Sequence, residues 1–167
     1  EGLFKRLKSE FLNQIFLFPD HQKPWISAVR RHVKQLPREK RPELVYATAN
    51  PWSALVAGRR VADHLGVPFV ADFRDPWTRN PKLQASNRLA EKARKLEREI
   101  VCSADRVIAN TEELRMAFIE DYPEFASKFV SITNGFNDIL LMRDETAKVM
   151  VKKQAKVELC HFGSVYE

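Results

Sequence analysis

The sequence predicts an α/β domain in which a doubly wound parallel sheet is flanked by helices. Two observations favour this class. From residue 44 onward, short β-branched and aromatic segments alternate with longer segments of helical periodicity, in the order β-α-β-α-β-α-β. The short segments include continuous apolar runs, which are typical of strands that are covered on both faces in a parallel sheet.

Each element has its own local signals. The first expected strand, residues 44–50, leads into a helix at 51–66 that Ser53 could cap and that Gly66 ends. The later elements are a strand at 67–73, a helix at 86–104 with Ser86 as its cap, a strand at 105–111, a helix opening at Thr111, and a strand at 128–136 that ends in the turn pair Asn134-Gly135. The predicted apolar stripe of the 86–104 helix is Leu89, Ala93, Leu96 and Ile100.

The first 36 residues are expected to form two helices with a break at 18–24. Residues 1–42 hold ten Lys/Arg and four Asp/Glu, so they carry the whole formal charge of +6. Such a segment can attract anionic lipid or nucleic acid. A solvated helical face explains the same pattern equally well, so the charge alone leaves both interpretations open.

Several classes of protein are not favoured by the sequence. No apolar run reaches the length of a membrane span, and no cleavage site follows the apolar stretch at 11–18, so neither a span nor a signal peptide is predicted. Cys102 and Cys160 are expected to be free, buried thiols in the cytoplasm. The five glycines form no phosphate-binding motif, the four histidines have no metal-ligand spacing, and no nucleic-acid-binding module is recognisable. We therefore expect no metal, no cofactor and no nucleic-acid partner.

Polar side chains follow three of the expected strands at their carboxyl ends, where open parallel sheets bind ligands. The first loop holds Thr48 and Asn50, the second is the segment 72–80, and the third holds Thr133, Asn134 and Asn137. These three loops could converge on one cleft.

The segment DFRDPWTRN, residues 72–80, has the richest chemistry of the three. Asp72 and Asp75 supply carboxylates that can orient a sugar hydroxyl or accept its proton. Arg74 supplies a planar fork for a phosphate, and Trp77 can stack on the face of a sugar. The alternative is that one of the two acids pairs with Arg74 only to hold the loop, although charge at the carboxyl end of a strand favours a functional role.

Three stretches together resemble a known family. They are PELVYATANPWSALVAGRRVADHLGVPFVADFRDPWT (42–78), LEREIVCSADRVIANTEELR (96–115) and KFVSITNGFN (128–137). Their order and content resemble the N-terminal domain of the family-four retaining glycosyltransferases, which have the GT-B fold. The run CHFGSVYE (160–167) resembles the first strand and glycine turn of the partner domain. The likeness covers most of the chain from Phe18 onward.

The resemblance implies two Rossmann-like domains around a cleft, with the acceptor on the first domain and a nucleotide-sugar donor on the second. On this basis, residues 1–150 are a partial acceptor-side domain, and residues 151–167 are the connector and first strand of a truncated donor domain. Gly163 and Ser164 match the turn that approaches the donor diphosphate through backbone N–H groups. The family usually needs no metal.

Many members have a histidine followed by an aspartate where this chain has Arg74 and Asp75. The arginine departs from that pattern and favours an anionic contact, such as a phosphate on the donor or the acceptor. The predicted catalytic residues are Asp72, Arg74 and Asp75, and the predicted substrate-binding residues are Trp77, Asn50, Asn134 and Gly135.

Two hypotheses of function follow. In the first, the chain is part of a cytoplasmic glycosyltransferase that moves a sugar from a nucleotide diphosphate to an unknown acceptor with retention, and this part alone is inactive. In the second, the chain is a non-catalytic module whose basic N-terminal helices dock on anionic lipid, at the periphery of a membrane, or on nucleic acid. A donor domain after Glu167 in the natural protein would favour the first.

Overall fold

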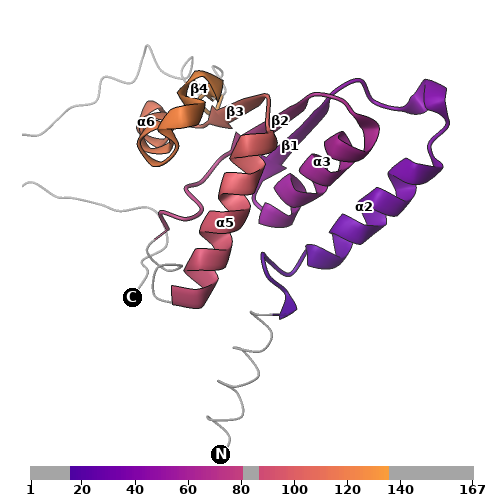
Figure 1. Ribbon diagram of the computed structural model, residues 1–167, viewed down its shortest axis with the longest axis horizontal. Helices are drawn as coiled ribbons and strands as arrows, with labels where there is room; N and C mark the ends of the chain where they lie inside the picture. The colour runs from indigo at the N-terminus through magenta and orange to yellow at the C-terminus, as the bar shows by residue number, and fades with distance from the viewer. Residues whose placement is uncertain (1–15, 81–86, 136–167) are drawn as a thin grey trace, which may run out of the picture. The chain divides into compact units, whose positions relative to one another are not determined.

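The computed structural model describes residues 16–80 and 87–135 of the chain (Figure 1). These residues form a four-stranded, all-parallel sheet in the order β1-β2-β3-β4. The strands are β1 (Val45–Ala49), β2 (Phe69–Phe73), β3 (Arg106–Ala109) and β4 (Phe129–Ser131). The helices are α2 (Lys23–Gln35), α3 (Trp52–Leu65), α5 (Asn87–Ser103) and α6 (Glu112–Asp121), with the short 3-10 helices η1 (Arg38–Lys40) and η2 (Pro123–Lys128). The predicted parallel sheet with flanking helices is confirmed.

Some predictions fall outside the described residues. They concern the helix at 1–15, the cap at Ser86, Asn137, the connector, and the segment 151–167 with Gly163 and Ser164.

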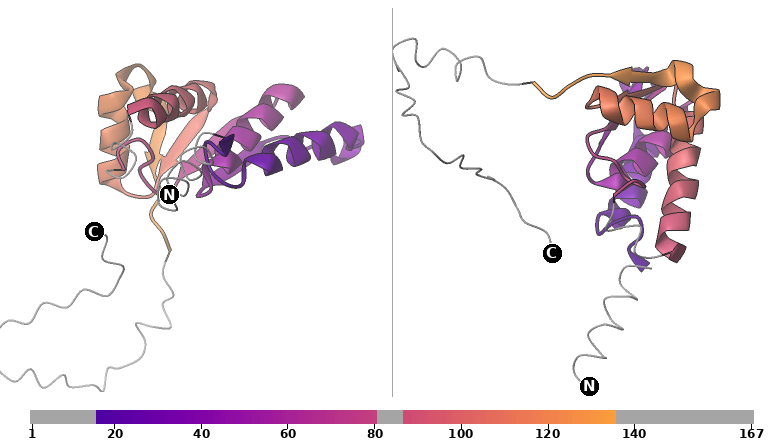
Figure 2. Two further views of the ribbon diagram at one scale, coloured as in Figure 1. Left: turned by 90° about the horizontal axis from the view of Figure 1, so that it is seen from below. Right: turned by 90° about the vertical axis from the view of Figure 1, so that its left-hand side faces the viewer.

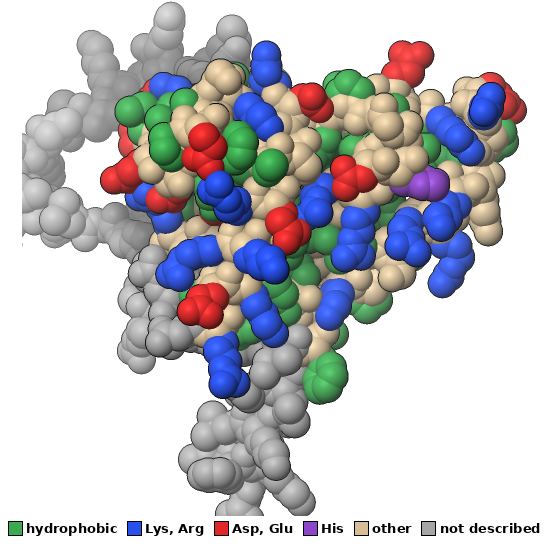
Figure 3. All heavy atoms as spheres, in the orientation of Figure 1, with side chains coloured by type: hydrophobic (Ala, Val, Ile, Leu, Met, Phe, Trp, Pro, Cys, Tyr) green, Lys and Arg blue, Asp and Glu red, His purple; other side chains and the backbone are tan. Residues whose placement is uncertain are grey.

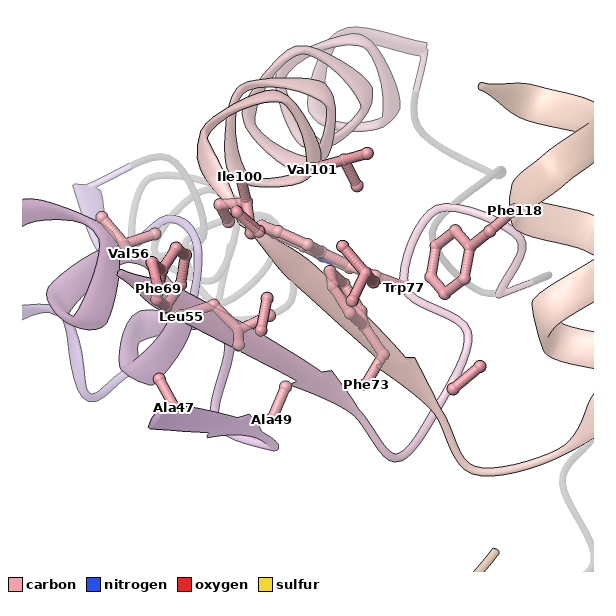
Figure 4. Close-up of a cluster of buried hydrophobic side chains, with 14 of the residues drawn as sticks. Ala47, Ala49, Leu55, Val56, Phe69, Phe73, Trp77, Ile100, Val101 and Phe118 are labelled. Carbon is pink, nitrogen blue, oxygen red and sulfur yellow. The ribbon is translucent and has the colours of Figure 1, made fainter. Parts of the chain in front are cut away.

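Helices α3, α5 and α6 pack on one face of the sheet (Figure 4). Ala47, Ala71 and Val107 lie side by side across β1, β2 and β3 on this face, and all three are buried. The strand order does not reverse within the described residues, and right-handed crossovers then bring successive helices to the same face. Helix α2 packs beside α3 at the edge of this layer (Figure 2).

The opposite face of the sheet is largely open within the described residues. Tyr46 on β1 is 51% exposed and Ile132, just after β4, is 50% exposed. Thr48 is exposed as well, whereas its register partner on β2, Asp72, is 1% exposed. Ile108, the register partner of Asp72 on β3, is also buried. A carboxylate is therefore buried at the carboxyl end of the central strands, on a face that is exposed at Tyr46, Thr48 and Ile132.

Gly58 allows α3 to approach β1 closely. A Cβ atom at this position would lie 2.6 Å from the Cβ of Ala47 and 3.0 Å from Cε2 of Phe69, both of which are side-chain atoms of the sheet. Only glycine fits that space without a shift of the helix or the strand, so Gly58 sets the distance between the two layers.

The first turn of α3 is capped by a distant residue. The Asp20 carboxylate accepts hydrogen bonds from the backbone N–H and the hydroxyl of Ser53, each at 2.7 Å. The prediction that Ser53 caps this helix is therefore wrong, because a negative charge at the N-terminus supplies the acceptor and also suits the helix dipole. The predicted cap of α6 is confirmed, since the Thr111 hydroxyl accepts from the N–H of Leu114 at 3.1 Å.

Helix α5 buries a wider set of residues than the predicted apolar stripe, since Ala90, Glu97 and Val101 are buried as well and Leu96 is only half-buried. Glu97 is 1% exposed, next to the buried Ala93, Ile100 and Val101. Cys102, which was expected to be buried, is exposed near the end of the helix. In the described part of the chain, no helix combines the length and the hydrophobicity that crossing a bilayer requires.

Candidate functional site

The candidate site lies at the carboxyl end of β2, on the open face of the sheet. Asp72 is the fourth residue of β2, so strand alternation directs its side chain away from the helices. Its Oδ2 atom accepts hydrogen bonds from the Tyr46 hydroxyl and from Nε of Arg74, the latter at 2.8 Å. Its Oδ1 atom is buried without a hydrogen-bond partner among the described residues. Asp72 thus lies within β2, as the predicted strand at 67–73 has it, just before the loop that follows.

Arg74 is the centre of the polar contacts at this edge. Its Nη1 atom donates to Oδ1 of Asn134 at 2.8 Å and to the carbonyl of Ile132 at 3.4 Å. The carbonyl of Arg74 accepts from Nδ2 of Asn110 at 2.6 Å, and its N–H donates to the carbonyl of Ala49 at 3.4 Å. The last residue of β1 and residues that follow β3 and β4 therefore all contact Arg74.

The guanidinium of Arg74 is held on two sides and open on a third. Nε is bound to Asp72 and Nη1 to Asn134, whereas Nη2 makes no hydrogen bond to any residue described in the structure. The side chain is 31% exposed. A cation fixed in this way can donate to an anionic group from its open side without losing its two supports.

The electrostatics of the cluster favour a charged arginine beside a neutral phenol. Burial, and then the hydrogen bond to the negative Asp72, raise the pKa of Tyr46. The contacts with Tyr46 and Asp72 outweigh desolvation and raise the pKa of Arg74. Tyr46 thus remains a hydrogen-bond donor and Arg74 remains a cation throughout the physiological range.

The other predicted site residues are placed differently. Asp75 is exposed and makes no ion pair or hydrogen bond within residues 16–80 and 87–135. Asn50 and Gly135 are also exposed. Asn50 lies between two successive cis peptide bonds, to Ala49 and to Pro51. The structure therefore joins Asp72, Arg74 and Asn134 by hydrogen bonds, whereas the side chains of Asn50 and Asp75 make none to the residues that the structure describes.

Trp77 lies in the core rather than beside an open cleft. It is 3% exposed, and its ring stacks on Trp52 at a centroid distance of 4.8 Å and an interplanar angle of 4°. Phe18 stacks at 6.5 Å, and Figure 4 shows Trp77 among the buried side chains near Phe118. The chain bends at residues 74 and 75, and the indole of Trp77 is buried in the core instead of projecting into solvent. In this position, packing accounts for the tryptophan.

Two contributors to the cluster were missed in the sequence. Asn110 directly follows the third strand, and its place at a strand's carboxyl end is the same signal that singled out the other loops. Tyr46 lies inside β1, in a run interpreted as a buried strand, so nothing in the local pattern indicated that its hydroxyl would reach Asp72. Only the pairing of β1 with β2 brings these two residues together.

A second polar network, centred on Glu97 of α5, holds the loop that follows β2. Glu97 accepts hydrogen bonds from the hydroxyl of Thr78 at 2.8 Å, from its N–H at 3.2 Å, and from the Tyr122 hydroxyl at 2.7 Å. Burial raises the pKa of Glu97, and the hydrogen bonds oppose that shift. Burial and the negative charge of Glu97 raise the pKa of Tyr122. The network ties the loop to α5 and to the residue between α6 and η2, and so supports the position of Arg74 indirectly.

A hollow of about 640 Å³ lies near this network, between α5 and the end of α6. Its lining includes Arg79, which is neutralised by Asp121 at 2.7 Å and Glu120 at 2.6 Å. None of the residues that contact the side chain of Arg74 lines it. In the described part of the chain, no three His, Cys, Asp or Glu side chains are grouped as metal ligands.

The site thus offers a fixed cation, a buried carboxylate and side-chain amides at the carboxyl edge of a parallel sheet. Among the curated proteins searched, none matches the chain. A family model described as Glycosyltransferase Family 4 matches residues 7–138, which include the whole sheet and the Arg74 cluster. The match covers well over half of the 167 residues. The chain belongs to glycosyltransferase family 4.

Proposed function

We propose that the full-length protein is a retaining glycosyltransferase that moves a sugar from a nucleotide-diphosphate donor to an acceptor. In this proposal the described domain holds the acceptor side of the cleft, and residues 151–167 begin a donor-binding domain of a GT-B enzyme. Gly163 and Ser164 would approach the donor diphosphate through backbone N–H groups. Membership of the family supports a role in sugar transfer.

The observation that carries the proposal is the fixed guanidinium of Arg74. Two anchors, Asp72 and Asn134, each at 2.8 Å, hold the group at the edge of the sheet where ligands bind in α/β folds. Nucleotide-sugar donors carry a diphosphate, and the Nη2 group that Asp72 and Asn134 leave open can donate charge-assisted hydrogen bonds to phosphate oxygens. Arg74 would bind the phosphate of the donor, or of a phosphorylated acceptor, as charge develops on the leaving group.

The remaining residues have separate roles in this scheme. Asp72 is a positioning residue, because its Oδ2 holds Arg74 and Tyr46 while the carboxylate itself is buried. Asp75 is exposed, and its carboxylate is free to accept a hydrogen bond from a sugar hydroxyl. Asn50 and the backbone at Gly135 are exposed at neighbouring loops and would contact the substrate. No step requires a metal or another cofactor.

The test uses the complete natural protein and a panel of nucleotide sugars, with the anomeric configuration of the product followed by NMR. Transfer with retained configuration is the expected result. Transfer with inversion would overturn the retaining mechanism while leaving sugar transfer intact. The proposed function would be contradicted if the folded protein neither transferred sugar from any of the donors nor hydrolysed any of them.

A further inference from the structure

We propose that the groove between α2 and α3 binds a phosphate-bearing anion, at a site separate from the Arg74 cluster. The groove consists of two adjoining hollows of about 310 Å³ each. Arg30 and Lys34 from α2 and Arg60 from α3 line both hollows. Ile26, Ser27 and Arg31 complete the first, and Asp63 and His64 complete the second. Figure 3 shows Lys and Arg side chains gathered over these two helices.

The cations of this groove have no acidic partner within the described residues. Arg30, Lys34 and Arg60 are exposed, and none of them forms an ion pair or a side-chain hydrogen bond there. The single acid that lines the second hollow, Asp63, lies 3.7 Å from Nε of Arg59. The positive charge of the groove is therefore uncompensated, in contrast to Arg59, Arg79 and Arg98, which all pair with carboxylates.

Helix stability does not explain this arrangement. Arg30 and Lys34 are four residues apart on α2, where like charges destabilise a helix. The helix dipole favours a cation only in the last turn, which applies to Lys34 and leaves Arg30 and Arg60 in mid-helix. Three cations that converge from two helices on one hollow are instead suited to an anion that bridges them.

The donors in the groove fit the chemistry of phosphate. Two guanidinium groups can each offer parallel N–H donors, the ammonium of Lys34 adds a mobile point charge, and the Ser27 hydroxyl adds a neutral donor. A phosphate has enough acceptor oxygens to occupy several of these donors at once. The headgroup of an anionic phospholipid and a soluble polyphosphate share this chemistry, and both can reach a groove that is open to solvent.

Binding at the groove is independent of the sugar-transfer proposal, because none of its lining residues contacts the side chain of Asp72, Arg74 or Asn134. The experiment therefore measures binding alone. The full-length protein is sedimented with vesicles of phosphatidylcholine, with and without phosphatidylglycerol, and titrated separately with inorganic pyrophosphate by calorimetry. The variant is the triple change Arg30→Gln, Lys34→Gln and Arg60→Gln.

The matched control removes three charges from α5, by Lys92→Gln, Arg94→Gln and Lys95→Gln, all of which are exposed. We expect at least one of the two probes to bind the unaltered protein and the control alike. The groove variant should bind on the order of a hundredfold more weakly, since each cation near an anionic surface contributes about a fivefold effect. Arg60→Gln alone should give about a fivefold loss, which provides a second variant if the triple change unfolds the protein.

Binding to vesicles alone would assign the groove to a lipid headgroup, and binding to pyrophosphate alone would assign it to a soluble phosphate. Binding of both would support a site for phosphate in either form. Absence of binding to either probe would overturn the proposal. It would equally be overturned by a loss of the same size in the groove variant and in the control, because the effect would then reflect net charge.

Discussion

Asp72 and Arg74 form an ion pair in which Oδ2 and Nε are 2.8 Å apart, with the side chain of Asp72 1% exposed and that of Arg74 31% exposed. The sequence left open whether such a pair would only hold the loop. The geometry is compatible with a supporting role that also serves binding, because the pair occupies Nε and leaves Nη2 without a partner among the described residues. A guanidinium that is already oriented loses less entropy when it binds an anion.

Variants of Trp77 distinguish a role of the indole in core packing from a role in contacting the substrate. With 3% of its surface exposed and Trp52 stacked on it at 4.8 Å, Trp77→Ala should lower the free energy of unfolding by about 3–5 kcal/mol. Trp77→Phe should cost less and leave KM for both substrates unchanged, because the ring does not reach the cleft. Thermal melting and KM are measured on the same full-length variants. A stable Trp77→Phe protein with a raised KM would instead place the indole against a sugar.

Glu97 gives a prediction about pH. Its pKa is raised from the ordinary 4.5 by burial, so the folded protein retains this proton to higher pH than the unfolded chain does. The stability that the protonated group contributes is fully present below the unfolded pKa and is lost as the pH rises through the folded one. The Glu97→Gln protein lacks this loss, so its stability should increase relative to the unaltered protein as the pH rises above 4.5.

Urea unfolding at a series of pH values checks this dependence, and Glu91→Gln, an exposed position on the same helix, is the control. Glu97→Ala should be destabilised at every pH, by about 1–3 kcal/mol for each donor that it leaves buried and unpaired at Thr78 and Tyr122. A stability difference between Glu97→Gln and the unaltered protein that does not change with pH would contradict the assignment of the raised pKa.

Substitution of Gly58 tests how closely α3 lies against β1. Alanine favours a helix interior by about 1 kcal/mol over glycine. At Gly58, however, the added Cβ would lie 2.6 Å from the Cβ of Ala47, and the strain of such overpacking is about 1–3 kcal/mol. We expect Gly58→Ala to lower the melting temperature, whereas Gly135→Ala should not, because apart from its chain neighbours no described residue lies within 4 Å of the new Cβ. A Gly58→Ala protein that melts higher than the unaltered one would show that the two layers are farther apart.

The order of elements could be predicted from the sequence because each strand and helix carries a local signal. The turn at Gly66 is an example, since its φ of 68° is the left-handed conformation that glycine adopts at a helix end. The cap of α3 could not be predicted, because Asp20 is 33 residues from Ser53 and only the packing of the chain brings them together. Local sequence patterns do not indicate contacts between residues that are so far apart in the chain.

The candidate site was partly predictable for the same reason. Arg74 and Asn134 follow strands, and their position at the carboxyl edge is a consequence of a parallel sheet. Trp77 was misplaced because a tryptophan in a polar loop has the same sequence pattern whether it faces solvent or folds back into the core. The burial of Glu97 was missed because a charged residue on an amphipathic helix ordinarily faces water. Its hydrogen-bond partners, Thr78 and Tyr122, are distant in the sequence and gave no local signal.

The central claim is that Arg74 and Asp75 act on the substrate, and turnover measured together with thermal melting on full-length variants tests it most directly. Arg74→Lys keeps the positive charge but loses the fork that joins Asp72 to Asn134, and Asp75→Asn removes an exposed charge that supports no other residue described in the structure. We predict that Asp75→Asn melts close to the unaltered protein, that Arg74→Lys remains folded but melts lower because the buried Asp72 loses part of its support, and that turnover of both falls about tenfold to a hundredfold. Folded Arg74→Lys and Asp75→Asn proteins with full turnover would contradict the account.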